Sequence, residues 1–165
     1  MSSVNDPVTI LAIDPGYDRV GWAVGIKNRR QPSLVDLGLI QTAKDRLIFD
    51  RYQEIVIELN RLIKKHHPKE LAIENLYFAK NTKTAMRVAE AKGVIIATAL
   101  THGLEVFEYD PSTIKQVVTG YGRADKLAVE KMVRLQLKLK DKLIDDTLDA
   151  AACYLTHILL DSNMW

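Results

Sequence analysis

The chain has 165 residues, of which 47% are hydrophobic and 27% are charged, and its formal net charge is +2 at pH 7. This composition is typical of a globular protein, and the length predicts a single domain spanning residues 1–165. The sequence contains no apolar run long enough to suggest a membrane span, and its amino terminus does not resemble a secretory signal, so we expect a cytoplasmic protein. The net charge is too small to indicate nucleic-acid binding by itself.

The single cysteine, Cys153, excludes an internal disulfide. Because it lies within an apolar run, we expect its thiol to be a small buried hydrophobic group and not a nucleophile. Redox chemistry is therefore not expected.

Three apolar runs rich in β-branched residues predict strands at residues 8–14, 19–26 and 34–41. The first run ends at Pro15-Gly16, which is typical of a turn, and the polar segment 27–32 separates the other two. These features predict a meander of antiparallel strands at the start of the fold.

A first amphipathic helix is expected at residues 46–65, where apolar residues recur at helical spacing until a proline interrupts the pattern at Pro68. A short strand at residues 71–74 follows, and then a helix rich in small residues at 84–101. Gly103 occupies the position where glycines end helices, and residues 104–109 predict a further strand.

Asp110 and Pro111 predict an N-cap and a first-turn proline for a short helix that ends near Gly120. Two longer helices are expected at about 124–138 and 143–161. Five strands alternating with helices in this order predict an α/β fold, in which helices cover the faces of a mixed sheet.

Carboxylates follow two of the predicted strands. Asp14 ends the run Leu-Ala-Ile-Asp, and Glu74 ends the run Leu-Ala-Ile-Glu. Asp146 and Asp149 lie three residues apart near the start of the last helix, so both can project from one face. Because functional sites in such sheets lie at strand ends and adjacent helix starts, we expect these four acids to come together.

Four neighbouring carboxylates repel one another unless cations neutralise them. Mg²⁺ prefers such hard oxygen ligands, and two ions about 4 Å apart can stabilise the attacking and leaving oxygens of a phosphoryl displacement. The acids therefore predict a metal-dependent phosphodiester hydrolase. Taken singly, however, each acid also has a structural interpretation, since Asp14 suits a turn and the two aspartates suit the first turn of a helix.

Several motifs occur in an order that resembles the RuvC family of Holliday-junction resolvases, the crossover junction endodeoxyribonucleases, over nearly the whole chain. They are Ala12-Ile13-Asp14-Pro15-Gly16 with Gly21-Trp22-Ala23, Ile73-Glu74-Asn75-Leu76-Tyr77-Phe78-Ala79-Lys80-Asn81, the segment from Ile114 to Lys126, and Asp146-Thr147-Leu148-Asp149-Ala150 followed by Thr156-His157.

This resemblance implies an RNase H-like fold and a homodimer that resolves four-way DNA junctions by paired nicks in opposing strands, in DNA recombination and repair. It implies that Asp14, Glu74, Asp146 and Asp149 are catalytic and bind Mg²⁺, with Mn²⁺ able to substitute and two ions in each site. It also implies that Lys115 and Lys126 contact DNA near the scissile phosphate. The sequence leaves open whether a branch-migration motor complex is a partner.

Two departures from the family pattern concern the substrate. Asn75 stands where glutamine is usual, and Tyr77 beside Phe78 stands where phenylalanine is expected. An aromatic side chain at this place can stack on an unpaired base, and we favour Tyr77 for that role while Phe78 is an alternative. The full set of expected DNA contacts comprises Tyr77, Phe78, Lys80, Lys83, Arg87, Lys115, Arg123 and Lys126.

The small residues of the helix at 84–101 allow close approach of another element. Packing within the chain explains them as well as a dimer does, but a two-fold dimer would match the pseudo-symmetry of a four-way junction. We expect His157 to be a structural histidine and not a metal ligand.

Alternative functions remain. A catalytically silent junction-binding protein would keep the fold without the reaction, and a related RNase H-like nuclease would act on other branched DNA. An actin-like ATPase or sugar kinase also places an acid and a glycine after its first strand, but such proteins need two such halves, which this length does not provide.

Overall fold

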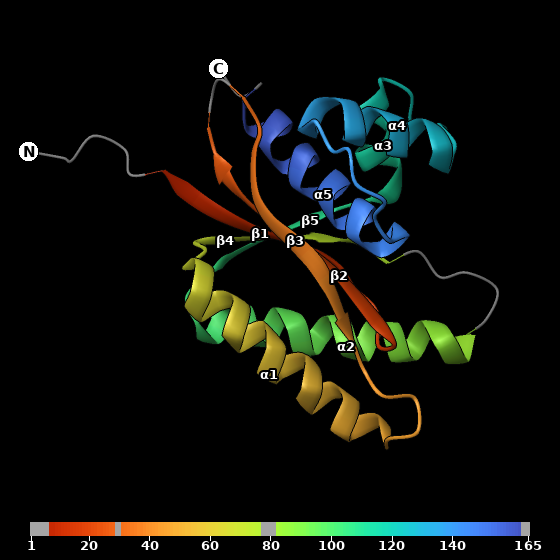
Figure 1. The fold of residues 1–165 in the computed structure, drawn as a ribbon. Coiled ribbons are helices and arrows are strands. Elements are labelled where there is room, and N and C mark those ends of the chain that lie inside the picture. Colours follow the sequence, from red (N-terminus) through yellow and green to blue (C-terminus); the bar gives the residue numbers. More distant parts are fainter. Residues whose placement is uncertain (1–6, 29–30, 77–81, 163–165) are drawn as a thin grey trace, which may run out of the picture.

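The computed structural model describes residues 7–28, 31–76 and 82–162. Within these ranges, the strands form a sheet in the order β3-β2-β1-β4-β5 (Figure 1). β1 pairs with β2 and β2 with β3 in antiparallel fashion, whereas the β1–β4 and β4–β5 pairs are parallel. The prediction of a mixed five-stranded sheet is therefore confirmed. The strands are β1 (Val8–Asp14), β2 (Arg19–Lys27), β3 (Ser33–Gln41), β4 (Glu70–Glu74) and β5 (Glu105–Tyr109).

Helices cover both faces of this sheet, as predicted (Figure 1). One face carries α1 (Ile48–His66) and α2 (Thr82–Thr101). The opposite face carries α5 (Asp145–Ser162), against which α3 (Pro111–Thr119) and α4 (Lys126–Leu137) pack. The helix ends lie within two residues of the ranges expected from the sequence.

The side chains of β1 divide between two hydrophobic cores, because successive residues of a strand point to opposite faces. Ile10 and Ala12 belong to the core that contains α5, whereas Leu11 and Ile13 belong to the core of α1 and α2. All four are completely buried. By the same alternation, Asp14 continues the row that faces α5.

The helix ends test the local sequence signals from which they were predicted. Gly103 and Gly120 both have positive φ, at 75° and 81°, as expected for residues that end helices. Asp110 occupies the predicted N-cap position of α3, but its carboxylate makes no capping bond and instead accepts a hydrogen bond of 3.1 Å from Asn75 Nδ2. Within the described residues, no helix is long and apolar enough to cross a membrane.

Candidate active site

Asp14 and Glu74 lie side by side at one edge of the sheet. β1 and β4 are parallel, and Ile13 is paired with Ile73, so the two acids follow a matched pair of residues. Ala12 and Ala72, two residues earlier in each strand, both face α5. The same pleat therefore directs both carboxylates toward the helix that carries the other two acids.

α5 approaches the sheet closely because glycines of β2 leave space for it. Gly21 is paired with Asp14 across the β1–β2 ladder. A Cβ atom at Gly21 would lie 1.9 Å from the backbone oxygen of Asp146, a distance that no real structure allows. Only glycine at this position lets the first turn of α5, with Asp146 and Asp149, rest against the end of β1.

Asp14, Glu74 and Asp149 lie in surroundings that raise their pKa values. Burial, followed by the charges of Glu74, Asp149 and Asp146, raises the pKa of Asp14 from 3.8 to about 8. Burial and the charge of Asp149 raise the pKa of Glu74 from 4.5 to about 7, although Lys115 and Lys126 act in the opposite direction. Burial also raises the pKa of Asp149. The structure thus brings together all four acids predicted from the sequence.

Two basic side chains, Lys126 and Arg19, contact the cluster of acids. Lys126 Nζ lies 3.3 Å from the Oδ2 atoms of both Asp145 and Asp149. Arg19 Nε lies 3.1 Å from Asp146 Oδ2. Each cation therefore neutralises part of the acidic cluster from a different side of the site.

A cavity of about 290 Å³ opens beside the acids. Its polar lining comes from Glu74, Asp149, Lys115 and Lys126, and its apolar lining comes from Pro111, Ile114, Val129 and Ala152. Carboxylates and lysines thus face the same space. This lining suits a polyanionic ligand that contacts the lysines directly and the carboxylates through metal cations.

The acids also fit divalent cations by their chemistry. Among the described residues, Asp146 Oδ2 is buried without a hydrogen-bond partner, so a cation at this position would satisfy it. Carboxylate oxygens are the hard ligands that Mg²⁺ prefers. Within the part of the chain that is described, no three His, Cys, Asp or Glu side chains form a group that could hold a metal ion as they stand.

The residues predicted to contact DNA fall into three groups. Lys115 and Lys126 line the cavity, and Arg123 is exposed nearby in the connection between α3 and α4. Lys83 and Arg87 lie near the start of α2, where Arg87 Nη1 is 2.8 Å from Glu90 Oε2. Three others, Tyr77, Phe78 and Lys80, lie outside the described residues.

The glycine-rich turn after α3 is braced by the side chains of Gln116 and Thr119. Gln116 Nε2 donates to the carbonyl oxygen of Gly120 at 2.9 Å, and Gln116 Oε1 accepts from the Gly122 N–H at 2.8 Å. Tyr121, between the two glycines, is exposed. The turn between Lys115 and Lys126 therefore has a defined shape.

His157 and Cys153 lie in the core. His157 Nε2 is 2.6 Å from Glu70 Oε2, and its Nδ1 is 2.6 Å from the Tyr109 hydroxyl, which confirms a structural histidine. Cys153 is completely buried, and this burial raises the pKa of its thiol well above the usual value. The prediction that Cys153 is a buried hydrophobic group is also confirmed.

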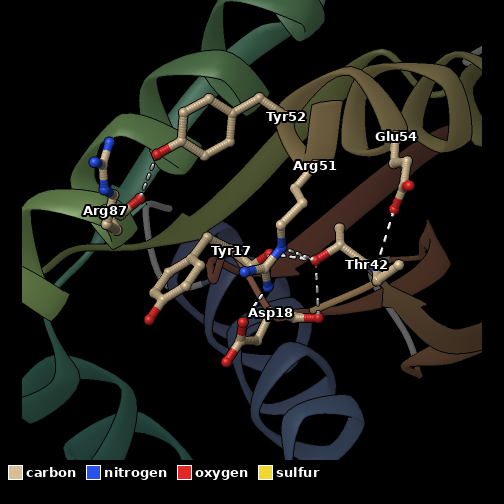
Figure 2. A network of polar contacts seen from close by, with 8 residues as sticks. Tyr17, Asp18, Thr42, Arg51, Tyr52, Glu54 and Arg87 are labelled. Carbon is tan, nitrogen blue, oxygen red and sulfur yellow. Dashed lines mark hydrogen bonds and ion pairs between the residues drawn. The ribbon is translucent and has the colours of Figure 1, made fainter. Parts of the chain in front are cut away.

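Two arginines with defined contacts, Arg19 and Arg51, were not predicted from the sequence. Arg51 of α1 is buried, and Figure 2 shows its guanidinium among Tyr17, Asp18 and Thr42. It lies three residues after Ile48 and four before Ile55, so helical spacing could have placed it on the buried face. Arg19, which pairs with Asp146, has no comparable signal, because one charged residue at the start of a strand is common on protein surfaces.

Known proteins resemble this chain over nearly its whole length. It matches the family model described as crossover junction endodeoxyribonuclease RuvC over residues 10–157. The protein of that name from Petrotoga mobilis is 42% identical over 151 residues, which cover 91% of this chain and 93% of the relative. The one from Brachyspira hyodysenteriae is 44% identical over 147 residues, covering 89% and 91%. A solved structure of T. thermophilus RuvC in complex with Holliday junction substrate has a TM-score of 0.87 at 27% identity, and the match covers 94% of this chain and 95% of that one.

Proposed function

Because the chain belongs to the RuvC family of crossover junction endodeoxyribonucleases, we propose that it resolves four-way (Holliday) DNA junctions by paired nicks in opposing strands. The roles are DNA recombination and repair, carried out in the cytoplasm by a single RNase H-like domain. The observation that supports this function most directly is the meeting of Asp14, Glu74 and Asp149 at one sheet edge, where burial, and after it the charges of neighbouring carboxylates, raise the pKa values of all three.

We assign the four acids Asp14, Glu74, Asp146 and Asp149 to the binding of Mg²⁺, with Mn²⁺ able to substitute and two ions in each site. When bound, such cations supply Lewis acidity at the phosphate and lower the pKa of the attacking water. The buried, unpartnered oxygen of Asp146 supports this assignment. So do the raised pKa values, since a cation would relieve the repulsion that raises them.

Basic side chains bring the phosphate to the acids. Lys115 and Lys126 line the same cavity as Glu74 and Asp149, so a phosphodiester bound there would meet positive charge beside the carboxylates. The braced turn between the two lysines holds the backbone in position for a close approach to a DNA strand. Arg123 extends this basic surface beyond the cavity.

A homodimer would give two such sites for the two nicks. Along α2, Ala89, Gly93 and Ala97 form an exposed row of small residues, and Met86 and Leu100 beside it are 62% and 57% exposed. A Cβ at Gly93 would meet nothing within 4 Å, so this part of the helix is open for a partner. We propose that two copies pack through this row, with an isologous interface that matches the junction's symmetry.

The experiment is a nicking assay on a synthetic four-way junction, run beside linear duplex, flap and fork substrates of the same sequence. We expect symmetric nicks in the junction that require Mg²⁺ or Mn²⁺ and disappear with a chelator. Asp14→Asn should bind the junction without cutting it, and the exposed Asp141→Asn should cut like the wild type.

Two results would contradict the proposal, and each would indicate a different function. Binding without nicking in either metal would identify a silent junction-binding protein. Equal cutting of flaps and forks would identify a nuclease for branched DNA in general.

A further inference from the structure

Asp146 is held by an unusual ion pair. Its Oδ2 atom is buried and has no hydrogen-bond partner in the part of the chain that the structure describes, although Arg19 Nε lies only 3.1 Å away. The contact is therefore an attraction between charges without the alignment of a hydrogen bond. The Arg19 side chain is 52% exposed, whereas that of Asp146 is 21% exposed. Solvent thus reaches the cation much more readily than the carboxylate.

The position of Arg19 is fixed by the turn that precedes it. Arg51 donates from Nε to Thr42 Oγ1 at 2.9 Å and from Nη2 to the Tyr17 carbonyl oxygen at 3.1 Å (Figure 2). It also pairs with the Asp18 carboxylate, and its guanidinium carbon lies 5.0 Å from the centre of the Tyr17 ring. Arg19 follows these clamped residues directly, so its backbone has little freedom to move away from α5.

The contacts of Arg51 and the Arg19–Asp146 ion pair differ in strength. The Arg51 guanidinium is buried and has several partners, whereas the Arg19 guanidinium of the Arg19–Asp146 pair is open to water. Exposed ion pairs contribute little and are weakened by salt. The clamped backbone keeps the Arg19 guanidinium close to Asp146. Because the ion pair itself is weak, the guanidinium can leave the carboxylate at a small cost in free energy.

We propose that Arg19 is an exchangeable counter-ion, which neutralises Asp146 in the metal-free protein and must leave this carboxylate when a divalent cation binds there. Arg51 acts as a positioning residue for Arg19 and touches neither the acids nor the substrate. This inference rests on the proposed function, in which Asp146 is a ligand of the cation. It assigns a role to a residue outside the four acids and the expected DNA contacts.

The test is calorimetric titration of the full chain with Mn²⁺ in the absence of DNA. Removing the competitor by Arg19→Ala should tighten Mn²⁺ binding by about two- to fivefold, the range expected for an exposed ion pair. The matched control is Arg46→Ala. Arg46 lies 3.3 Å from Glu54, the two side chains are 57% and 26% exposed, and Mn²⁺ binding should be unchanged.

Salt and a second substitution separate competition from a general structural effect. The difference between Arg19→Ala and the wild type should shrink as KCl rises to about 1 M, because the pair is screened. Arg51→Lys should tighten Mn²⁺ binding in the wild type and change it no further in the Arg19→Ala background. An equal change in both backgrounds would contradict the positioning role of Arg51.

Unchanged or weaker Mn²⁺ binding in Arg19→Ala would overturn the counter-ion role, since a competitor cannot be removed without a gain in affinity. This failure is distinct from failure of the proposed function. If the wild type binds Mn²⁺ and nicks junctions while Arg19→Ala binds Mn²⁺ equally, only the inference about Arg19 fails. If the wild type neither binds Mn²⁺ nor nicks, the proposed function itself fails.

Discussion

Replacing Asp14 by asparagine should make the metal-free protein more stable at alkaline pH. The pKa of Asp14 is raised from 3.8 to about 8 in the folded chain by burial and by the neighbouring acids. Between these values the folded state holds a proton that the unfolded state has lost, so folding stability falls as pH rises. The contribution of Asp14 is complete below its unfolded pKa and is lost as pH passes through about 8.

The magnitude follows from the same values. Each pH unit in this window costs about 1.4 kcal/mol, so the wild type should lose about 4 kcal/mol relative to Asp14→Asn between about pH 5 and about pH 8. Glu74, whose pKa is raised to about 7, adds a smaller slope that both proteins share. Taking the difference between the two proteins cancels that shared part.

The assay is urea unfolding with a chelator present, at several pH values across this window. Asp36→Asn is the control, because burial acts to raise the pKa of Asp36 but its neighbours, Lys65 first among them, together outweigh burial and leave that pKa lowered. That substitution should therefore give no gain in stability as pH rises. A constant difference between wild type and Asp14→Asn from about pH 5 to about pH 8 would refute the explanation by repulsion among buried acids.

Three further predictions concern the surroundings of the site. Lys126→Ala should weaken junction binding and reduce the slope of log K against log salt by about 0.9 if one phosphate contact is lost; an unchanged slope would exclude that contact. Gly21→Ala should destabilise the fold by about 1–3 kcal/mol in thermal unfolding and slow cleavage, because its Cβ would meet the Asp146 carbonyl; wild-type stability would show that α5 can shift freely. Gly93→Arg should convert the proposed dimer to a monomer in analytical ultracentrifugation, whereas Leu135→Arg, at an exposed position of α4, should not; a dimer that persists in Gly93→Arg would exclude the α2 interface.

The parts of the fold that the sequence predicted well are those with a local cause. Asp14 and Glu74 were placed at strand ends because an apolar run stops at each of them. Their meeting required more, namely that β1 and β4 pair in parallel with Ile13 opposite Ile73. That pairing depends on contacts between residues far apart in the chain, and a hydrophobic pattern specifies it only indirectly.

The residues that sequence reasoning missed depend on tertiary contacts. Helical spacing allows Arg51 on the buried face of α1, but charged residues are mostly exposed. The sequence does not show the oxygens that bind its guanidinium, which are the Tyr17 carbonyl oxygen after β1 and Thr42 Oγ1 after β3. Asp110 lies at the predicted N-cap position, but its side chain makes a contact that the sequence did not predict. Its sequence position is that of a capping residue, but Asn75 offers its carboxylate a different donor.

Tyr154 fixes the position of α5 along its own helix axis. This position therefore does not depend on the segment that leads into α5. Its hydroxyl contacts the carbonyl oxygens of Ile26 and Ser33 at 3.0 Å each, and a Cβ at Gly25 would lie 2.1 Å from its ring. A residue inserted in the connection at 138–144 would therefore be absorbed as a longer loop. One inserted between Asp149 and Tyr154 would instead rotate the two aspartates by about 100° and move them about 1.5 Å along the axis. Length variation should accordingly be tolerated before α5 and excluded within its first half.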